Sequence, residues 1–299
     1  MPNRRQFLRY SAAATVAATL PGKAFGASAD PLASRNIAAT GEALPVIGLG
    51  NSRAFRDADL ATAGNLIDIF LDHGGRYIDA SGSSRFIVGR IAQQKAASER
   101  LFIGNYIDPR ASAAMRQEIR QVAQAQGKPA LDLVHTRDID GYRRRHANYQ
   151  QLKDDGLVRY IGVARSGERT FEAIGNLVDA GQVDFIQVNY SLLEPDAAER
   201  LLPLAKDKGV AVCINRPFIN GRYFSVVRGQ PLPDWAAEFD CHSWAQFSLK
   251  FILGNPAVNC VLTETANPGH AQENLAAGTG RLPDAQTQRR MLEVIRRLV

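Results

Sequence analysis

Eight short apolar runs, separated by longer amphipathic stretches, constrain the fold of this 299-residue chain more than any other feature. Each run has four to six residues and is rich in Val, Ile and Leu, as strands buried on both faces of a parallel sheet usually are. The runs span residues 45–48, 77–80, 101–106, 131–136, 160–164, 184–188, 210–215 and 258–262. The stretches over 57–73 and 243–253 place their apolar residues on one helical face.

This alternation predicts one α/β domain, a (β/α)8 or TIM barrel over residues 30–299. A parallel sheet of this size needs helices to cover it, and one barrel takes roughly 250 residues. A doubly wound sheet is the alternative, but Gly48-Leu49-Gly50 lacks the third glycine of a dinucleotide-binding motif. A last helix at about 283–298 should pack outside the barrel. In such barrels the chemistry occurs at the C-terminal ends of the strands, so the residues that follow each run are the candidates for function.

The first 29 residues predict a twin-arginine signal peptide. Residues 3–9 read Asn-Arg-Arg-Gln-Phe-Leu-Arg, a short apolar run follows over 10–20, and 24–29 is rich in small residues suited to cleavage. The apolar run is shorter than the ~20 residues that span a bilayer, so we expect no stable membrane insertion. A disordered basic N-terminus is the alternative. The signal implies the Tat export machinery as a partner and the periplasm as the destination.

Charge and cysteine content exclude some classes of function. The formal net charge is +6, but four of the basic residues lie in the leader, which has no acidic residue. The rest of the chain has no long Lys/Arg run and no zinc-finger spacing, so we expect no nucleic-acid partner. Cys213, Cys241 and Cys260 are too few and too scattered for a disulfide framework or a Cys-rich metal site. We expect them to be buried as small apolar residues, and we expect no metal.

Six segments resemble the aldo-keto reductase family, in the same order along the chain. They are Gly41–Gly50, Gly74–Asp79, Asp155–Val163, Gln187–Ser191, Asn215–Phe218 and Ser243–Gln246. The resemblance covers about residues 38–298 and implies NAD(P)H-dependent reduction of carbonyl compounds. In the family, nicotinamide delivers hydride while a tyrosine hydroxyl protonates the carbonyl oxygen. Because a free phenol has a pKa of about 10, that tyrosine depends on a lysine–aspartate pair and on a histidine.

Only one of the four catalytic residues that this resemblance implies is present. Asp79 ends the second strand, but Ser84 stands where the tyrosine is expected, and Tyr106 takes the place of the lysine. Arg137 occupies the histidine position. His135 points to the same barrel face about 6.6 Å deeper, and is either a shifted catalytic histidine or a hydrogen-bonded core histidine. The candidate catalytic residues are therefore Asp79, Tyr106 and Arg137.

The cofactor positions implied by the resemblance are altered as well. Ala164-Arg165 replace a Ser-Asn pair, Asn215 replaces an aromatic residue that stacks on nicotinamide, Thr263-Glu264 replace a Pro-Gly pair, and Asn267 replaces an arginine for the 2′-phosphate. Glu264 would place negative charge near phosphate oxygens, which is unfavourable at close range. Gln187, Arg216, Glu273 and Asn274 match the family. The resemblance therefore implies NADP as cofactor, and the substitutions predict that its binding is weakened.

Five arginines follow strand ends, and they form a second pattern. They are Arg53, Arg85, Arg137, Arg165 and Arg216. Because strand ends converge in a closed barrel, several guanidinium groups should share the mouth, where they can hold a carboxylate or phosphate. Alternatively, some point into solvent or pair with Asp79, Asp138 and Glu264. We expect Arg137 to pair with Asp79, since an unpaired buried carboxylate is costly.

Two functions remain open at this point. One is a non-catalytic barrel that binds a small anionic ligand at its mouth, outside the cytoplasm. The other is an NAD(P)H-dependent carbonyl oxidoreductase that uses substitute residues such as Tyr106 as the acid. The missing catalytic residues favour the first, and so does export, because the reduced nicotinamide pool is cytoplasmic.

Overall fold

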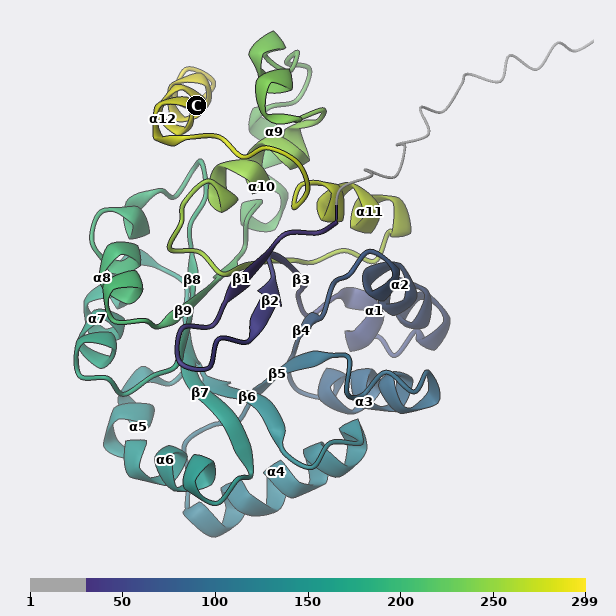
Figure 1. Ribbon diagram of the computed structural model, residues 1–299, viewed down its shortest axis with the longest axis vertical. Helices are drawn as coiled ribbons and strands as arrows, with labels where there is room; N and C mark the ends of the chain where they lie inside the picture. Colours follow the sequence, from purple (N-terminus) through teal and green to yellow (C-terminus); the bar gives the residue numbers. More distant parts are fainter. Residues whose placement is uncertain (1–30) are drawn as a thin grey trace, which may run out of the picture.

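The computed structural model describes residues 31–299, so the predicted leader lies outside the described residues. Eight parallel strands close into a barrel in the order β10-β3-β4-β5-β6-β7-β8-β9, and helices surround it (Figure 1). The predicted (β/α)8 barrel is therefore confirmed.

Each barrel strand coincides with one of the eight apolar runs. The strands are β3 (Ile47–Leu49), β4 (Tyr77–Ala80), β5 (Phe102–Tyr106), β6 (Leu131–Thr136), β7 (Val158–Ala164), β8 (Phe185–Asn189), β9 (Ala211–Asn215) and β10 (Cys260–Thr263). Every residue of β4, β6 and β8 is buried. This follows from helices covering the outer face while side chains fill the interior.

The helices of the outer ring include those that the sequence predicts. They are α1 (Arg53–Arg56), α2 (Leu60–Asp72), α3 (Ser84–Gln94), α4 (Ser112–Gln126), α5 (Ile139–Arg144), α6 (His146–Asp154), α7 (Phe171–Asp179), α8 (Leu201–Asp207), α9 (Arg222–Val226), α10 (Trp244–Leu253), α11 (Pro268–Ala276) and α12 (Ala285–Arg296). Asp59, Ser243 and Asp284 cap α2, α10 and α12 by accepting a hydrogen bond from a backbone N–H of the first turn. The last helix, α12, lies outside the barrel as predicted (Figure 1).

A short antiparallel hairpin closes the N-terminal end of the barrel. Its strands are β1 (Ser34–Asn36) and β2 (Ala43–Pro45), and Figure 1 shows them lying across the barrel. Ile37 and Leu44 of this segment are fully buried, in one cluster with Tyr77, Phe102 and other inward-facing residues of the strands. The hairpin plugs this end of the barrel, so the opposite end is the one available for a site.

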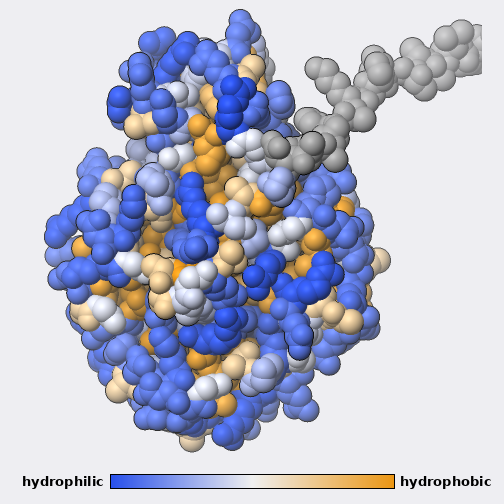
Figure 2. Space-filling view, viewed as in Figure 1, coloured by the Kyte–Doolittle hydropathy of each residue, from blue (hydrophilic) through white to orange (hydrophobic). Residues whose placement is uncertain are grey.

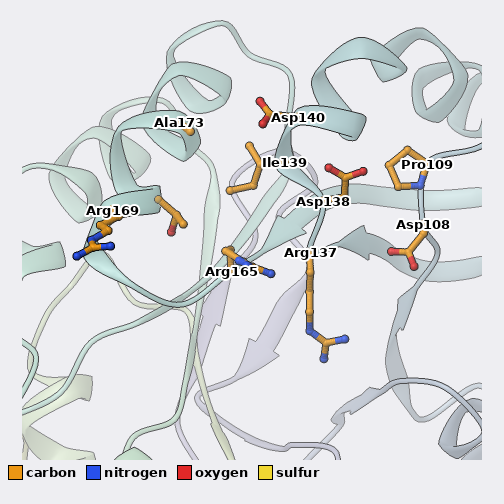
Figure 3. A pocket seen from close by; sticks show the side chains of 10 residues that line it. Asp108, Pro109, Arg137, Asp138, Ile139, Asp140, Arg165, Arg169 and Ala173 are labelled. Atoms are coloured by element: carbon orange, nitrogen blue, oxygen red, sulfur yellow. The ribbon is translucent and has the colours of Figure 1, made fainter.

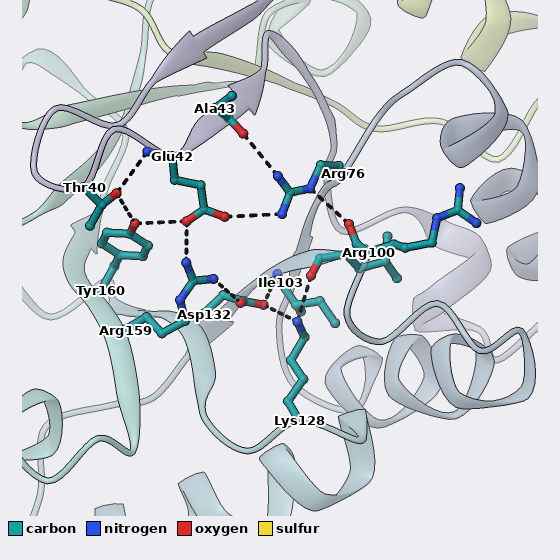
Figure 4. Close-up of polar contacts among 11 residues, drawn as sticks. Thr40, Glu42, Ala43, Arg76, Arg100, Ile103, Lys128, Asp132, Arg159 and Tyr160 are labelled. Carbon is teal, nitrogen blue, oxygen red and sulfur yellow. Dashed lines mark hydrogen bonds and ion pairs between the residues drawn. The ribbon is translucent and has the colours of Figure 1, made fainter.

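Polar contacts hold the hairpin against the barrel strands (Figure 4). Glu42 accepts hydrogen bonds from Arg76 at 3.3 Å and from the Tyr160 hydroxyl at 3.0 Å, and it also pairs with Arg159. Asp132 extends the network inward: its carboxylate contacts Arg159 Nη1 at 2.9 Å, Lys128 Nζ at 2.8 Å and the backbone N–H of Ile103 at 2.9 Å. Asp132 is 3% exposed, so these three donors surround a buried charge.

The surface in view (Figure 2) is mostly polar, and the three cysteines are buried. The face seen in Figure 2 is largely hydrophilic, with apolar residues scattered between charged ones. Cys213, Cys241 and Cys260 are free and buried, as predicted. Within residues 31–299, no helix is long and apolar enough to cross a membrane. The same residues contain no cluster of three or more His, Cys, Asp or Glu side chains that could hold a metal ion.

Candidate functional site

A pocket of about 410 Å³ opens at the C-terminal ends of the barrel strands. Its lining comes from residues at or after most of these ends: Asn51, Arg56, Asp79, Tyr106, Arg137, Ala164, Arg165, Ser166, Gln187, Asn215, Arg216, Asn220 and Glu264. All of them except Ala164 carry a polar or charged side chain. Four arginines face two carboxylates, so the pocket carries a surplus of positive charge.

Asp79 forms the centre of the pocket floor. It ends β4 and is 4% exposed. Its Oδ2 accepts hydrogen bonds from the Tyr106 hydroxyl at 3.2 Å and from Gln187 Nε2 at 3.3 Å, and Gln187 Nε2 also donates to the Tyr106 hydroxyl oxygen at 3.2 Å. Strands β4, β5 and β8 thus each contribute one inward-facing side chain to a closed triangle.

Tyr106, in the position where the family has lysine, holds its proton tightly. Burial of the hydroxyl raises the pKa of Tyr106 well above its usual value, and the neighbouring Asp79 carboxylate raises it further. Arg137 and the hydrogen bond from Gln187 oppose these effects only in part. A catalytic acid works best with a pKa near the working pH. The surroundings of Tyr106 instead raise its pKa further above neutral pH.

The predicted ion pair between Arg137 and Asp79 is wrong. No such pair is present among the described residues; instead, the Arg137 guanidinium carbon lies 3.9 Å from the centroid of the Tyr106 ring. The ring attracts the cation through its negative face, while the hydroxyl of the same ring reaches Asp79. Tyr106 and Gln187 therefore satisfy Asp79, and Arg137 stays at the exposed rim of the pocket.

His135 lies beneath Tyr106 and does not line the pocket. It is 1% exposed, and its ring centroid is 4.1 Å from that of Tyr106 on the adjacent strand. Its Nε2 lies 3.1 Å from Asp79 Oδ1, but the two atoms are poorly aligned and do not form a hydrogen bond. This placement fits a core histidine better than a catalytic one, although the hydrogen bond expected of a core histidine is not formed at Nε2.

Three of the five predicted mouth arginines share the pocket: Arg137, Arg165 and Arg216. Arg85 does not, so its predicted ligand-binding role is wrong. It is 9% exposed, donates to the backbone oxygens of Gly82 and Tyr106 at 3.0 Å, and pairs with Glu118 at 2.8 Å. Because Arg85 lies in the first turn of helix α3, its side chain packs between α3 and α4 instead of entering the mouth.

Arg53 is also absent from the mouth pocket, which corrects its predicted role. Ser52 caps α1, so Arg53 is the first helical residue, and it lines a separate surface hollow instead. Arg56, one turn further along α1, lines both this hollow and the mouth pocket, and it contacts Glu264 at 3.7 Å. Sequence reasoning missed Arg56 because this short helix gives no clear apolar periodicity.

The segment after β9 carries two pocket residues in an unusual backbone conformation. Arg216 and Asn220 have φ values of 53° and 52°, and Ile219 between them has φ of 48°. Such left-handed values are strained for residues other than Gly and Asn, at a cost of order 1–3 kcal/mol each, and cluster at functional sites. The strained residues here are Arg216 and Ile219, whereas Asn220 adopts this conformation readily; Arg216 and Asn220 both line the pocket.

The remaining cofactor-position residues lie as follows. Gln187 is on the pocket floor, Asn215 lines the pocket and accepts a hydrogen bond from Ser166 Oγ at 2.8 Å, while Glu273 and Asn274 lie on α11 and do not line it. Asn267 Oδ1 caps α11 by accepting from the N–H groups of the residues two and three positions on. This atom therefore stabilises the helix start.

A second, wider hollow of about 690 Å³ adjoins the mouth (Figure 3). Its lining includes Asp108, Asp138 and Asp140 on one side and Arg169 on the other. Arg137 and Arg165 line both this hollow and the mouth pocket. These two arginines therefore lie between the two hollows.

Comparison with known proteins agrees with this architecture. The aldo/keto reductase family model matches residues 46–290, and a model of the twin-arginine translocation pathway signal sequence matches residues 1–21. The NADH-specific methylglyoxal reductase of Escherichia coli is 23% identical over 218 residues, which are 62% of this chain and 66% of that protein. The aligned part therefore spans slightly less than two thirds of that relative's length.

Solved structures show the same fold at low identity. An aldo-keto reductase from Bacillus halodurans in its holo form has a TM-score of 0.71 and 18% identity, covering 88% of this chain and 96% of its own. An aldo-keto reductase from Klebsiella pneumoniae in complex with NADPH has a TM-score of 0.70 and 18% identity, covering 85% and 92%. With its barrel and the family match over 46–290, the chain belongs to the aldo/keto reductase family, and it carries a twin-arginine signal sequence at its N-terminus.

Proposed function

We propose that this protein is an exported, non-catalytic member of the aldo/keto reductase family that binds a small anionic molecule at the barrel mouth. One observation carries the proposal. Arg137, Arg165 and Arg216 converge on a pocket whose floor is the hydrogen-bonded cluster of Tyr106, Asp79 and Gln187. The charged groups that a ligand can reach are therefore mainly these arginines. The tyrosine, lysine and histidine that the family uses for proton transfer are replaced.

The residues at the mouth do not fit the family's nicotinamide cofactor. Glu264 places a carboxylate in the loop after β10, where the resemblance implies phosphate, and it packs closely against Gly50. Arg165 and Asn215 stand where the family has an asparagine and an aromatic residue for the nicotinamide. We therefore propose that NADP binding is weak, and we derive no hydride transfer for this chain.

The oxidoreductase alternative requires Tyr106 to donate a proton near neutral pH. Its raised pKa and its hydrogen bond to the Asp79 carboxylate argue against that role. An arginine-lined pocket needs no such step. Guanidinium groups bind carboxylate and phosphate oxygens in a bidentate way and remain charged at any physiological pH.

Anion binding is tested by thermal unfolding of the mature protein. Sulfate, phosphate or acetate should raise the Tm, because a ligand that binds only the folded state stabilises it by about 2.7 kcal/mol at 100 times its Kd. For a domain of this size that corresponds to roughly 5–10 °C. The shift should shrink at high salt, because exposed arginines are screened.

Matched variants make that experiment specific. Arg165→Ala and Arg137→Ala should remove most of the anion-dependent shift, because both side chains line the pocket. Arg90→Ala removes an exposed arginine of α3 that does not line the pocket, and should leave the shift unchanged. An equal shift in all three variants would mean that the anions act through general charge screening, and the proposed site would be abandoned.

We propose the periplasm as the place where the mature protein acts. Replacing Arg4 and Arg5 by Lys should leave the precursor in the cytoplasm, because the twin-arginine receptor reads that pair. Cell fractionation and immunoblotting measure the exported fraction, and Arg9→Lys, outside the pair, serves as the control. Unchanged export of the double variant contradicts the assignment.

A further inference from the structure

We infer that the anion bound at the mouth is a hydroxylated carboxylate of about six carbons, a sugar acid in chemical class, and not a bare inorganic ion. This inference rests on the proposed binding function and adds the chemistry of the ligand's uncharged part. It follows from two hydrogen-bond acceptors of pocket residues, Gln187 Oε1 and Asn51 Oδ1, that have no donor within residues 31–299.

Gln187 supplies the first of these acceptors. Its Nε2 donates to both the Asp79 carboxylate and the Tyr106 hydroxyl, which fixes the amide orientation and turns Oε1 away from them. Gln187 is 4% exposed, and its Oε1 has no hydrogen-bond partner in the described part of the chain. A buried acceptor left unsatisfied costs about 1–3 kcal/mol. A ligand hydroxyl that donates to this oxygen would recover that cost.

Asn51 supplies the second. Asp79 is not counted with them, because Oδ2 already accepts two hydrogen bonds and Oδ1 lies 3.1 Å from Nε2 of the buried His135. Asn51 donates through Nδ2 to Ser81 Oγ at 2.9 Å, and its Oδ1 is buried without a partner within residues 31–299. Gln187 and Asn51 line the same pocket; Gln187 lies within β8, and Asn51 follows the end of β3.

The rim and the floor of the pocket are therefore suited to different groups of one molecule. The rim suits a carboxylate, and the floor suits hydroxyl groups. Arg137 and Arg165 are exposed at the rim, where a carboxylate can reach them and stay partly hydrated. A sulfate dianion has no proton to donate to Gln187 or Asn51, and a hydrogen phosphate dianion has only one for the two acceptors. The charge of either dianion would also be repelled by Asp79 if it moved down to the floor.

The shape and lining also narrow the ligand class. A volume of about 410 Å³ lies toward the small end of the roughly 300–1,000 Å³ typical of small-molecule sites. Ala164 is the one lining residue without a polar side chain, and Arg137 covers a face of the Tyr106 ring at 3.9 Å. An aromatic or long apolar ligand therefore finds little to pack against, whereas a compact polyhydroxylated acid matches donors and acceptors throughout.

Isothermal titration of the mature protein separates the two parts of this inference. Gluconate and hexanoate share one negative charge and a six-carbon chain, and differ in their hydroxyl groups; glucose has hydroxyls without the charge. We expect gluconate to bind at least tenfold more tightly than either hexanoate or glucose. Sulfate tests whether negative charge without hydroxyl groups is enough for binding at the rim.

The relative affinities of these ligands decide between the anion site and the hydroxylated class. Equal affinity for gluconate and hexanoate overturns the hydroxylated class but leaves the proposed anion site standing. Glucose that binds as well as gluconate, or the failure of all the anions to bind, overturns the proposed function and this inference with it. Sulfate that binds as tightly as gluconate also removes the sugar-acid inference.

Variants of the acceptors test the placement of the ligand. Gln187→Met removes the Oε1 acceptor together with the Nε2 donor, with little change in size, and should weaken gluconate about tenfold more than hexanoate. If Gln187→Met does not fold, Asn51→Leu provides the same test at the second acceptor. Arg90→Ala, outside the pocket, is the control. If gluconate keeps its full advantage over hexanoate in both folded variants, the acceptors do not hold the hydroxyls and the inference fails.

Discussion

Mature protein mixed with NADPH and methylglyoxal, or with any standard aldehyde, is expected to show no measurable fall in absorbance at 340 nm. The Escherichia coli methylglyoxal reductase that shares 23% identity with part of this chain is the positive control, assayed with both NADH and NADPH. We expect a rate at least about a thousandfold lower, since a positioned general acid alone contributes roughly 10²–10⁴-fold. Losses of groups that act together do not simply add.

The physical reason lies in the Tyr106–Asp79 contact. The phenol donates its hydrogen bond to a carboxylate at 3.2 Å, so transferring that proton to a substrate would place two negative charges side by side. Burial and Asp79 both raise the pKa of Tyr106, whereas the family's lysine would lower the pKa of its tyrosine. Restoring the missing tyrosine is not simple either, because Ser84 is 1% exposed and leaves no room for a phenol.

Cofactor binding gives an independent measurement. Trp235 and Trp244 provide intrinsic fluorescence, and we expect NADPH to quench it weakly or not at all. Micromolar affinity for NADPH together with turnover of any carbonyl would overturn the non-catalytic proposal. Tight binding without turnover would overturn only the proposed weakening of the cofactor site.

The sequence was sufficient to predict the strands because both faces of a barrel strand are buried. Each run of Val, Ile and Leu marks a strand without any alternation to interpret, and each matches a strand of the closed barrel. The residues that follow a strand are placed at the mouth by the same geometry. Asp79, Tyr106 and Gln187 therefore meet on the floor although 108 positions separate the first from the last.

Side chains on helix starts and loops were harder to predict. Arg85 and Arg53 follow strands just as Arg165 does, but each lies in the first turn of a helix and outside the mouth pocket. Arg216 lines the pocket from a positive φ that is uncommon for arginine and that no sequence pattern predicts. The failed Arg137–Asp79 pair has a similar origin, since a charge count cannot show that Tyr106 intervenes.

The largest expected change in stability comes from the plugged end of the barrel. Asp132→Ala leaves Lys128, with a side chain 6% exposed, without its carboxylate, and it removes the acceptor for the backbone N–H of Ile103 (Figure 4). Removing one partner of a buried ion pair costs about 3–5 kcal/mol, because the other charge stays buried and unpaired. For a domain of this size we expect the Tm to fall by roughly 6–20 °C, measured by thermal unfolding.

The control for this variant is an ion pair of the same type on the surface. Asp140 contacts Arg143 at 3.1 Å with both side chains more than 60% exposed, so Asp140→Ala should cost less than about 1 kcal/mol. The double variant Lys128→Met, Asp132→Leu should recover much of the loss, since apolar residues of similar volume often replace a buried pair without penalty. If Asp132→Ala proved as mild as Asp140→Ala, hydration would reach Lys128 in the folded state. The hairpin would then cover the barrel end without sealing it from water.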